Sequence, residues 1–269
     1  GEGTLNLLGT NLFTGVVRLA GGIVSIGADA ALGDAENDVL LAGGSLATTA
    51  SLSLPATRGL SGSGGLLPAE GTTLSVAGPV EAAGLTLGSK GTLELTNTDL
   101  LSIALLTLNA EGSVTGAPLT LQSVVSHLTS GEATIANDLL MGTSTRILSV
   151  DAGGTVVLAG DITLGGSAAL TKTGLGTLRL TGDNSQLFRV AIGTQGVAPV
   201  SGGVIQFDNN TALGTNPVFL NYGTLEALAP LTGASALPVG ASMGGRSAAP
   251  VIFKGADIEL AGSSGLFGS

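Results

Sequence analysis

The stretch that decides the fold runs from Leu170 to Asn184 and reads LTKTGLGTLRLTGDN. In its second half, Leu178 and Leu180 alternate with Thr177 and Arg179, the period-two pattern of a β-strand with one buried face. The Gly-Asp-Asn triplet that follows consists of residues that tolerate the backbone of tight turns. The stretch therefore predicts a short β-strand that ends in a turn.

The same phrase, a glycine followed by Thr or Ser and then an aliphatic residue, recurs along most of the chain with a mean spacing of 22 residues. Its anchoring glycines are Gly3, Gly22, Gly44, Gly71, Gly91, Gly112, Gly131, Gly154, Gly176, Gly203 and Gly223. Recurrence on this scale is typical of a solenoid, in which each coil buries its apolar face against its neighbours. Three strands of about five residues with three short turns make a coil of about 20 to 25 residues. We therefore expect an all-β parallel β-solenoid of about 12 coils, forming one continuous body over residues 1–269.

A longer internal match supports the repeat. Residues 1–11 align with residues 174–184 at an offset of 173, and residues 21–33 align with residues 202–214 at an offset of 181. The repeat-like copies thus lie near 1–54 and 170–228, and the second contains eight extra residues. Insertions of this kind belong in loops that project from a solenoid, and Gly193–Pro199 is the expected loop.

The stretch Leu170–Asn184, together with Asn11–Gly15 and Leu19–Ile23 of the first copy, resembles the autotransporter-associated β-strand repeat. The resemblance implies a right-handed parallel β-helix in the passenger region of a large secreted or surface-attached protein of a Gram-negative-type bacterium. The second copy departs from the pattern at Ser185–Phe188, which leaves the turn there undefined. The resemblance supplies no fixed catalytic residues.

Composition excludes several classes of function. Charged residues make up 10% of the chain, and the densest apolar stretch, Leu100–Leu108, already contains Ser102 and Thr107. It is too short to span a bilayer and fits either one or two helical turns or buried strands. The net charge of −10 and the scattered Lys and Arg argue against nucleic acid as a partner. The chain has no cysteine, so disulfides and thiol chemistry are absent.

Few residues suggest catalysis. His127 is the single histidine, which leaves little for a His-based metal site or proton shuttle, and we expect it at a turn or on the surface. Gly174-x-Gly176 and Gly1-x-Gly3 could begin a phosphate loop, but strand residues rather than a helix follow them.

Carboxylates provide the remaining candidates. Asp34, Glu36 and Asp38, or Asp208 with Asn209 and Asn210, could offer oxygen ligands to calcium, although neither set matches a known calcium loop. Glu94 with Glu111, and Asp138, Asp151 and Asp161, lie about one coil apart or less and could form acid–base pairs for glycan cleavage. No basic cluster accompanies them. We therefore assign no catalytic, cofactor or metal site and expect that the protein is not an enzyme.

The sequence favours a structural passenger segment, a rigid spacer or display rod on the bacterial surface or in the extracellular space. The alternatives are an adhesin that recognises a host or glycan surface through Gly193–Pro199 or Leu54–Pro68, and a self-assembling fibre subunit; a glycan-cleaving β-helix ranks last. The expected partners are neighbouring coils of a parent chain, or identical chains end to end, because apolar strand-like sequence reaches both termini.

Overall fold

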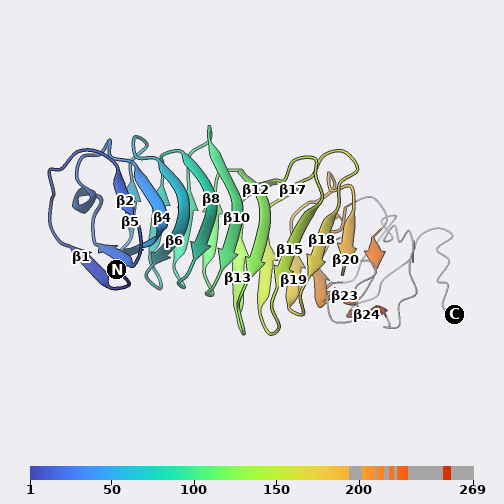
Figure 1. Ribbon diagram of the computed structural model, residues 1–269. Helices are drawn as coiled ribbons and strands as arrows, with labels where there is room; N and C mark the ends of the chain where they lie inside the picture. The colour runs from blue at the N-terminus through green and yellow to red at the C-terminus, as the bar shows by residue number, and fades with distance from the viewer. Residues whose placement is uncertain (194–201, 210, 215–217, 221–222, 230–250, 256–269) are drawn as a thin grey trace. The chain divides into compact units, whose positions relative to one another are not determined.

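The computed structural model describes residues 1–269 except 194–201, 210, 215–217, 221–222, 230–250 and 256–269. These residues form two compact units, one of Gly1–Leu121 with Ala133–Asn137 and the other of Gln122–Glu132 with Asp138–Ser269. Both units are built from parallel strands stacked coil upon coil (Figure 1). The prediction of an all-β parallel solenoid is confirmed, and the described residues form about ten turns. The prediction of about twelve coils counts all 269 residues at 22 per coil, including those outside the described ranges.

The first unit contains a single short 3-10 helix, η1 (Asp29–Leu32), among its described residues. Its strands are β1 (Thr4–Leu7), β2 (Val17–Leu19), β3 (Ile23–Ile26), β4 (Val39–Thr48), β5 (Leu52–Leu54), β6 (Leu60–Pro68), β7 (Thr73–Val76), β8 (Val80–Leu87), β9 (Thr92–Leu95), β10 (Leu101–Leu108), β11 (Ser113–Gly116) and most of β13 (Glu132–Ile135). Strand β12 (Leu119–Ser126) contributes residues to both units.

The strands that belong to the second unit are β14 (Leu139–Leu140), β15 (Arg146–Val150), β16 (Thr155–Leu158), β17 (Ile162–Thr163), β18 (Leu170–Thr173), β19 (Thr177–Leu180), β20 (Val190–Ile192), β21 (Val204–Phe207), β22 (Phe219–Leu220), β23 (Gly223–Ala227) and β24 (Val251–Gly255). In one ladder of this unit β16, β19, β21, β23 and β24 follow one another, and in another β15, β18, β20 and β22 do.

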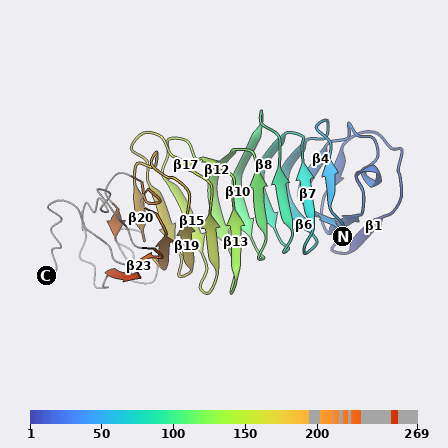
Figure 2. The ribbon, with the colours of Figure 1, turned by 180° about the vertical axis from the view of Figure 1, so that it is seen from behind.

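From β4 onwards, each coil of the first unit combines a long strand with a short one. Figure 1 shows the long strands β4, β6, β8 and β10 side by side, and Figure 2 shows the short strands β7 and β13 from behind. The long strands serve two sides of the coil: β4 pairs with β2 through Val39–Leu41 and with β3 through Ser45–Thr48, with a register shift from β4 to β6 between Ala42 and Ser45. The sequence predicts three strands per coil. In these coils two of the three are joined into one long strand, so each coil has two strands. The run Leu100–Leu108 is almost entirely strand β10, which decides between strand and helix.

Alternation along the strands sorts side chains as the sequence predicts. Leu178 and Leu180 of β19 have no solvent exposure, whereas Arg179 between them is partly exposed and forms an ion pair with Glu132 across 2.7 Å. The prediction that the aliphatic face of this strand forms the core is therefore confirmed.

The repeated phrase changes its place in the coil within the first unit. Gly22 and Gly44 precede β3 and the second half of β4, which pair with each other. From Gly71 onwards the phrase precedes the short strands instead, beginning with β7 and β9. The spacing of 27 residues between Gly44 and Gly71 is therefore one coil plus the step to the next side. The phrase therefore marks the start of a strand, but it does not determine on which side of the coil that strand lies.

Two sequence expectations need correction. The proposed binding loop Leu54–Pro68 is mostly strand β6, because Leu60 and Leu66 face inwards with 1% and no exposure, and only the turn 55–59 projects. The alignment of residues 1–11 with 174–184 pairs Leu5 with Leu178 and so predicts a core position for Leu5, but Leu5 is 57% exposed because β1 is the end strand of its ladder. Most of the other proposed loop, Gly193–Pro199, lies outside the described residues. None of the helical structure in the described part of the chain has the length and apolar character needed to cross a membrane.

Candidate functional site

The most elaborate polar arrangement in the first unit surrounds Arg58, which lies in the turn between β5 and β6 and has no solvent exposure. Its Nε donates to Asp29 Oδ1 at 2.8 Å, and Nη2 donates to Asp29 Oδ2 at 3.3 Å and to the Asp34 carbonyl oxygen at 3.0 Å. Nη1 donates to the carbonyl oxygen of Asn37. The planar guanidinium thus fastens the segment 29–38 to the following coil, a use that depends on the forked geometry of arginine.

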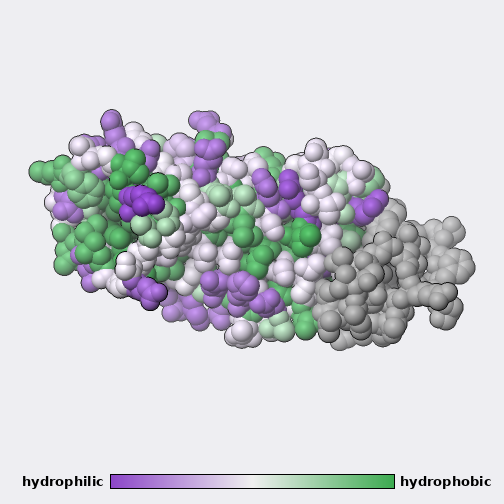
Figure 3. Space-filling model, viewed as in Figure 1, coloured by the Kyte–Doolittle hydropathy of each residue, from purple (hydrophilic) through white to green (hydrophobic). Residues whose placement is uncertain are grey.

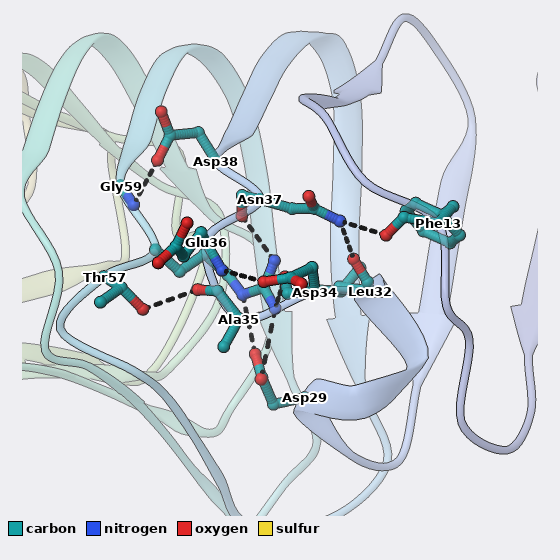
Figure 4. Close-up of polar contacts among 11 residues, drawn as sticks. Phe13, Asp29, Leu32, Asp34, Ala35, Glu36, Asn37, Asp38, Thr57 and Gly59 are labelled. Carbon is teal, nitrogen blue, oxygen red and sulfur yellow. Dashed lines mark hydrogen bonds and ion pairs between the residues drawn. The ribbon is translucent and has the colours of Figure 1, made fainter.

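Asn37 continues this network towards the N-terminus. Its buried side-chain Nδ2 donates to the carbonyl oxygens of Phe13 and Leu32 at 3.0 and 3.1 Å, as Figure 4 shows, and its Oδ1 accepts the backbone N–H of Gly15 at 2.7 Å. The network therefore replaces a strand ladder at η1, where the backbone groups lack neighbouring strands as partners. Its chemistry is that of a structural tie.

Asp34 and Asp38, two of the acidic residues that could offer ligands to calcium, accept hydrogen bonds within the same network. Asp34 Oδ1 accepts the N–H of Glu36 at 3.0 Å, and Asp38 Oδ1 accepts the N–H of Gly59 at 2.8 Å (Figure 4). Across the described ranges, no three His, Cys, Asp or Glu side chains gather closely enough to hold a metal ion. The three carboxylates of Asp34, Glu36 and Asp38 therefore do not converge on one point.

The second calcium candidate is a turn. Asn209 Nδ2 donates to the Thr181 carbonyl oxygen at 3.0 Å, and its Oδ1 accepts the N–H of Thr211 at 3.0 Å. Asp208 accepts a hydrogen bond from the Asn209 side chain at 3.0 Å, and Asn210 lies outside the described residues. Asn97 and Asn137 make the equivalent bond to the preceding coil, to Ala77 and Ala117, so this asparagine position stabilises turns.

Of the proposed acid–base residues, the structure brings Asp138 and Asp161 together. Asp138 Oδ1 accepts the N–H of Asp161 at 3.0 Å, and Asp161 Oδ1 accepts the N–H of Asp183 at 2.8 Å, so three exposed aspartates stack at one corner of successive coils. Hydrogen bonds from the side chain of Thr211 and the backbone of Ser185 lower the pKa of Asp183. The carboxylates of Asp138 and Asp161 each accept a backbone N–H of the next coil and so stabilise its turn.

The other proposed residues are separated. Asp151 pairs with His127 across 3.0 Å, and both side chains are about half exposed, which places His127 on the surface as expected. Glu111 pairs with Lys90 at 3.0 Å in a turn, and this hydrogen bond raises the pKa of Lys90, whereas Glu94 lies within β9. These carboxylates are not arranged as a facing pair.

Lys172 is the unexpected cation of the second unit. It is fully buried in β18, between Leu148 of β15 and Ile192 of β20, where an aliphatic side chain would continue the core. Its Nζ donates to three carbonyl oxygens, of Thr173 at 2.7 Å, Gly174 at 2.8 Å and Gly202 at 3.2 Å. None of the salt bridges between described residues includes it. Burial lowers the pKa of Lys172 to about 7.

A surface groove of about 380 Å³ lies beside the turn 55–59. Its polar lining includes Asp38, Thr57, Ser61 and Glu81, and Leu100 adds an apolar side chain that is 42% exposed. Carboxylates, hydroxyls and an apolar surface side by side can bind a polar ligand through hydrogen bonds. This groove is the part of the proposed loop Leu54–Pro68 that the structure leaves available for recognition.

Sequence reasoning missed both buried cations. Lys172 could have been found, because it shares the inward phase of Leu170 in the strand pattern. Arg58 gave no such signal, since it lies in a turn without periodicity, and its partner Asp29 is 29 residues away.

Comparison with known proteins gives one partial relative. Over 78 residues the chain is 42% identical to the adhesin BmaC autotransporter of Brucella suis biovar 1 (strain 1330). The match covers 29% of this chain and 2% of that protein, so the chain corresponds to a small part of the relative's length. No protein-family model and no solved structure matches the chain. The partial similarity and the β-solenoid fold together fit a repeat of the kind found in an autotransporter passenger.

Proposed function

We propose that this chain is a structural passenger segment, a rigid spacer or display rod in a bacterial surface or secreted protein. Its coils belong, on this proposal, to the autotransporter-associated β-strand repeat and form one continuous solenoid. The observation that carries the proposal is the parallel backbone ladder, which joins coil to coil around a closed aliphatic interior. The partial similarity to an autotransporter adhesin supports a place on the cell surface.

The polar features support a mechanical role. Arg58 ties an irregular segment to its neighbouring coil, and the aspartates 138, 161 and 183 cap successive turns. These groups are occupied with protein partners, as expected of side chains that hold a scaffold in shape. We therefore propose that the segment has no catalytic activity.

A second candidate function is adhesion. The relative is an adhesin, and the groove next to Thr57 and Ser61 offers hydrogen-bonding groups at the surface. On this alternative the solenoid would present the groove to a host or glycan surface. Replacement of Ser61 and Glu81 by alanine should then reduce adhesion of displaying cells, whereas a pure spacer would tolerate both changes.

Small-angle X-ray scattering on the chain tests the spacer proposal. A continuous solenoid predicts a single rod-like cross-section and a pair-distance distribution with a long linear tail. Two maxima, as expected of separate bodies joined by a flexible link, would contradict it. The shape of that distribution depends only on the arrangement of the chain and not on a ligand. The result therefore distinguishes one continuous rod from independent domains.

A further inference from the structure

The groove beside the turn 55–59 presents negative charge without a matching cation. Its lining includes the exposed carboxylates of Asp38 and Glu81, and none of the described residues that line it is basic. Neither carboxylate belongs to an ion pair with another described residue. The guanidinium of Arg58, in the adjoining turn, has no solvent exposure and is paired with Asp29. The charge of the groove is therefore available to a ligand.

The groove lies at a gap in a row of capping aspartates. The residues immediately before the long strands β4, β6, β8 and β10 are Asp38, Gly59, Pro79 and Leu100. An aspartate at such a position accepts an N–H of the next coil, as Asp38, Asp138 and Asp161 do. Gly59 has no carboxylate to offer, and Pro79 has no N–H that would need one. The row is thus interrupted without leaving a backbone donor unpaired, and the space of the absent side chain is open.

The two walls of the groove differ in character. A Cβ at position 59 would lie 3.0 Å from Asp38 Oδ1, so the absence of a side chain keeps the groove open beside this carboxylate. Figure 4 shows Oδ1 directed at the Gly59 N–H and the second oxygen of Asp38 pointing away from that bond. On the other side Pro79 is exposed and Leu100 is 42% exposed. Figure 3 shows hydrophilic and hydrophobic surface side by side along this upper edge of the first unit, where the long strands begin.

Arginine side chains match both walls. Their apolar stems can lie along Pro79 and Leu100 while the charged heads stay in water, and a guanidinium binds a carboxylate through two parallel N–H groups. Asp38 and Glu81 belong to coils two hydrogen-bonded steps apart, a separation of about 10 Å. In an extended peptide, two arginines separated by one residue lie on the same face about 7 Å apart. Their long side chains can therefore reach one carboxylate each.

We infer that this groove binds an extended, arginine-containing segment of a partner protein, with one guanidinium on Asp38 and another on Glu81. The inference rests on the adhesive function proposed for the groove and names the chemistry of the surface that is bound. A neutral glycan would leave both carboxylates without a charged partner, whereas a basic segment is complementary to them. The continuous-rod proposal does not depend on it.

A peptide titration tests this binding. The ¹⁵N-labelled chain is titrated with acetyl-Gly-Arg-Ala-Arg-Gly-amide and followed by nuclear magnetic resonance, with shifts expected at the backbone N–H groups of Gly59, Ser61 and Glu81. The same peptide with citrulline in place of both arginines keeps the shape but loses the charge, and it should bind at least about tenfold more weakly.

Two pairs of substitutions separate the groove from the overall charge of the chain. Asp38→Asn with Glu81→Gln should weaken binding of the arginine peptide at least about tenfold, and the new amide oxygen at position 38 can still accept the Gly59 N–H. The matched control, Glu70→Gln with Glu94→Gln, removes the same charge from residues of the first unit that do not line the groove. It should change the affinity by less than about twofold.

Three results would overturn the inference. Equal weakening by both pairs would mean that overall charge, and not the groove, holds the peptide. Unchanged binding in Gly59→Val, which fills the hollow without altering the charge, would mean that the peptide lies elsewhere. Adhesion of displaying cells that depends on Ser61 and Glu81, together with no binding of the arginine peptide, would keep the adhesive function and refute the basic partner.

Discussion

The side-chain amide of Asn184 donates a hydrogen bond to the carbonyl oxygen of Ala212 at 2.7 Å. In the first copy of the repeat, Asn11 makes the corresponding bond to Ala31 at 2.8 Å. The two donors are offset by 173 residues and the two acceptors by 181, so the eight extra residues of the second copy leave the contact unchanged. The repeat therefore conserves a polar tie between coils as well as an aliphatic pattern.

Replacing Leu178 by Asp is expected to destabilise the second unit by several kcal/mol. The side chain has no exposure, so the change would bury a carboxylate without a partner. Arg179→Ser, on the outward face of the same strand, should cost no more than about 1 kcal/mol, because it removes an exposed ion pair. Thermal unfolding of both variants checks the assignment of faces, and equal losses would contradict it.

Replacing Arg58 by Met is expected to cost about 3 to 5 kcal/mol, the usual effect of removing one partner from a buried ion pair. The change removes the donor to Asp29 and to the Asn37 carbonyl oxygen, and one of the two donors to the Asp34 carbonyl oxygen. Arg58→Lys should recover little of this loss, since an ammonium group lacks the fork. Urea unfolding measures the losses, with Lys90→Ala as the control, because that residue belongs to a solvent-exposed ion pair, which contributes little to stability. A loss for Arg58→Met no larger than the control's would refute the structural tie.

Lys172 predicts a dependence of stability on pH. Its folded pKa of about 7 lies below the ordinary value of 10.5, so between these values the unfolded chain binds more protons than the folded chain. Stability should therefore rise as pH increases from about 7 towards 10, by at most about 5 kcal/mol, and should be lowest below pH 7. The lowered pKa of Asp183 changes stability only in acid, and the raised pKa of Lys90 changes it only above pH 10, so neither contributes between pH 7 and 10.

Urea unfolding at pH 6.5, 8 and 9.5 measures how the free energy of unfolding changes with pH. Lys172→Met is the matched control, because it keeps most of the side-chain volume and removes the titrating group. The slope should flatten in that variant, whatever its absolute stability. An identical slope in both proteins would assign the pH dependence to other groups.

The chain is expected to show no hydrolase or lyase activity on pectin, alginate or peptidoglycan. Its stacked aspartates accept backbone N–H groups, and Asp151 pairs with His127 on the surface. Assays for reducing ends and unsaturated products over a wide pH range provide the check. Activity that disappears in Asp161→Asn, Glu94→Gln or Asp151→Asn would contradict the structural interpretation.

The sequence could predict the coil but not its irregular parts. Period-two alternation predicted the inward position of Leu178, and the alignment of the two copies paired Asn11 with Asn184, whose matching hydrogen bonds only the structure shows. It could not predict that Leu5 would be exposed, because burial of a ladder position depends on the coils beside it. The Arg58 network was equally inaccessible, since it joins a turn to a 3-10 helix through contacts between residues 21 to 29 apart.

The proposal that both units continue one solenoid implies that the number of coils sets the distance along it, and deletion of a single coil tests this most directly. Val80 pairs with Leu101, so removal of residues 80–100 joins Pro79 to Leu101 and takes out one complete coil. Spin labels at Ser61→Cys in the first unit and Thr163→Cys in the second report the distance between them by electron paramagnetic resonance. The account predicts narrow distributions in both proteins, with the mean shortened by about 5 Å, one hydrogen-bonded step, in the deletion. An unchanged mean, or a broad distribution in the intact chain, would contradict it.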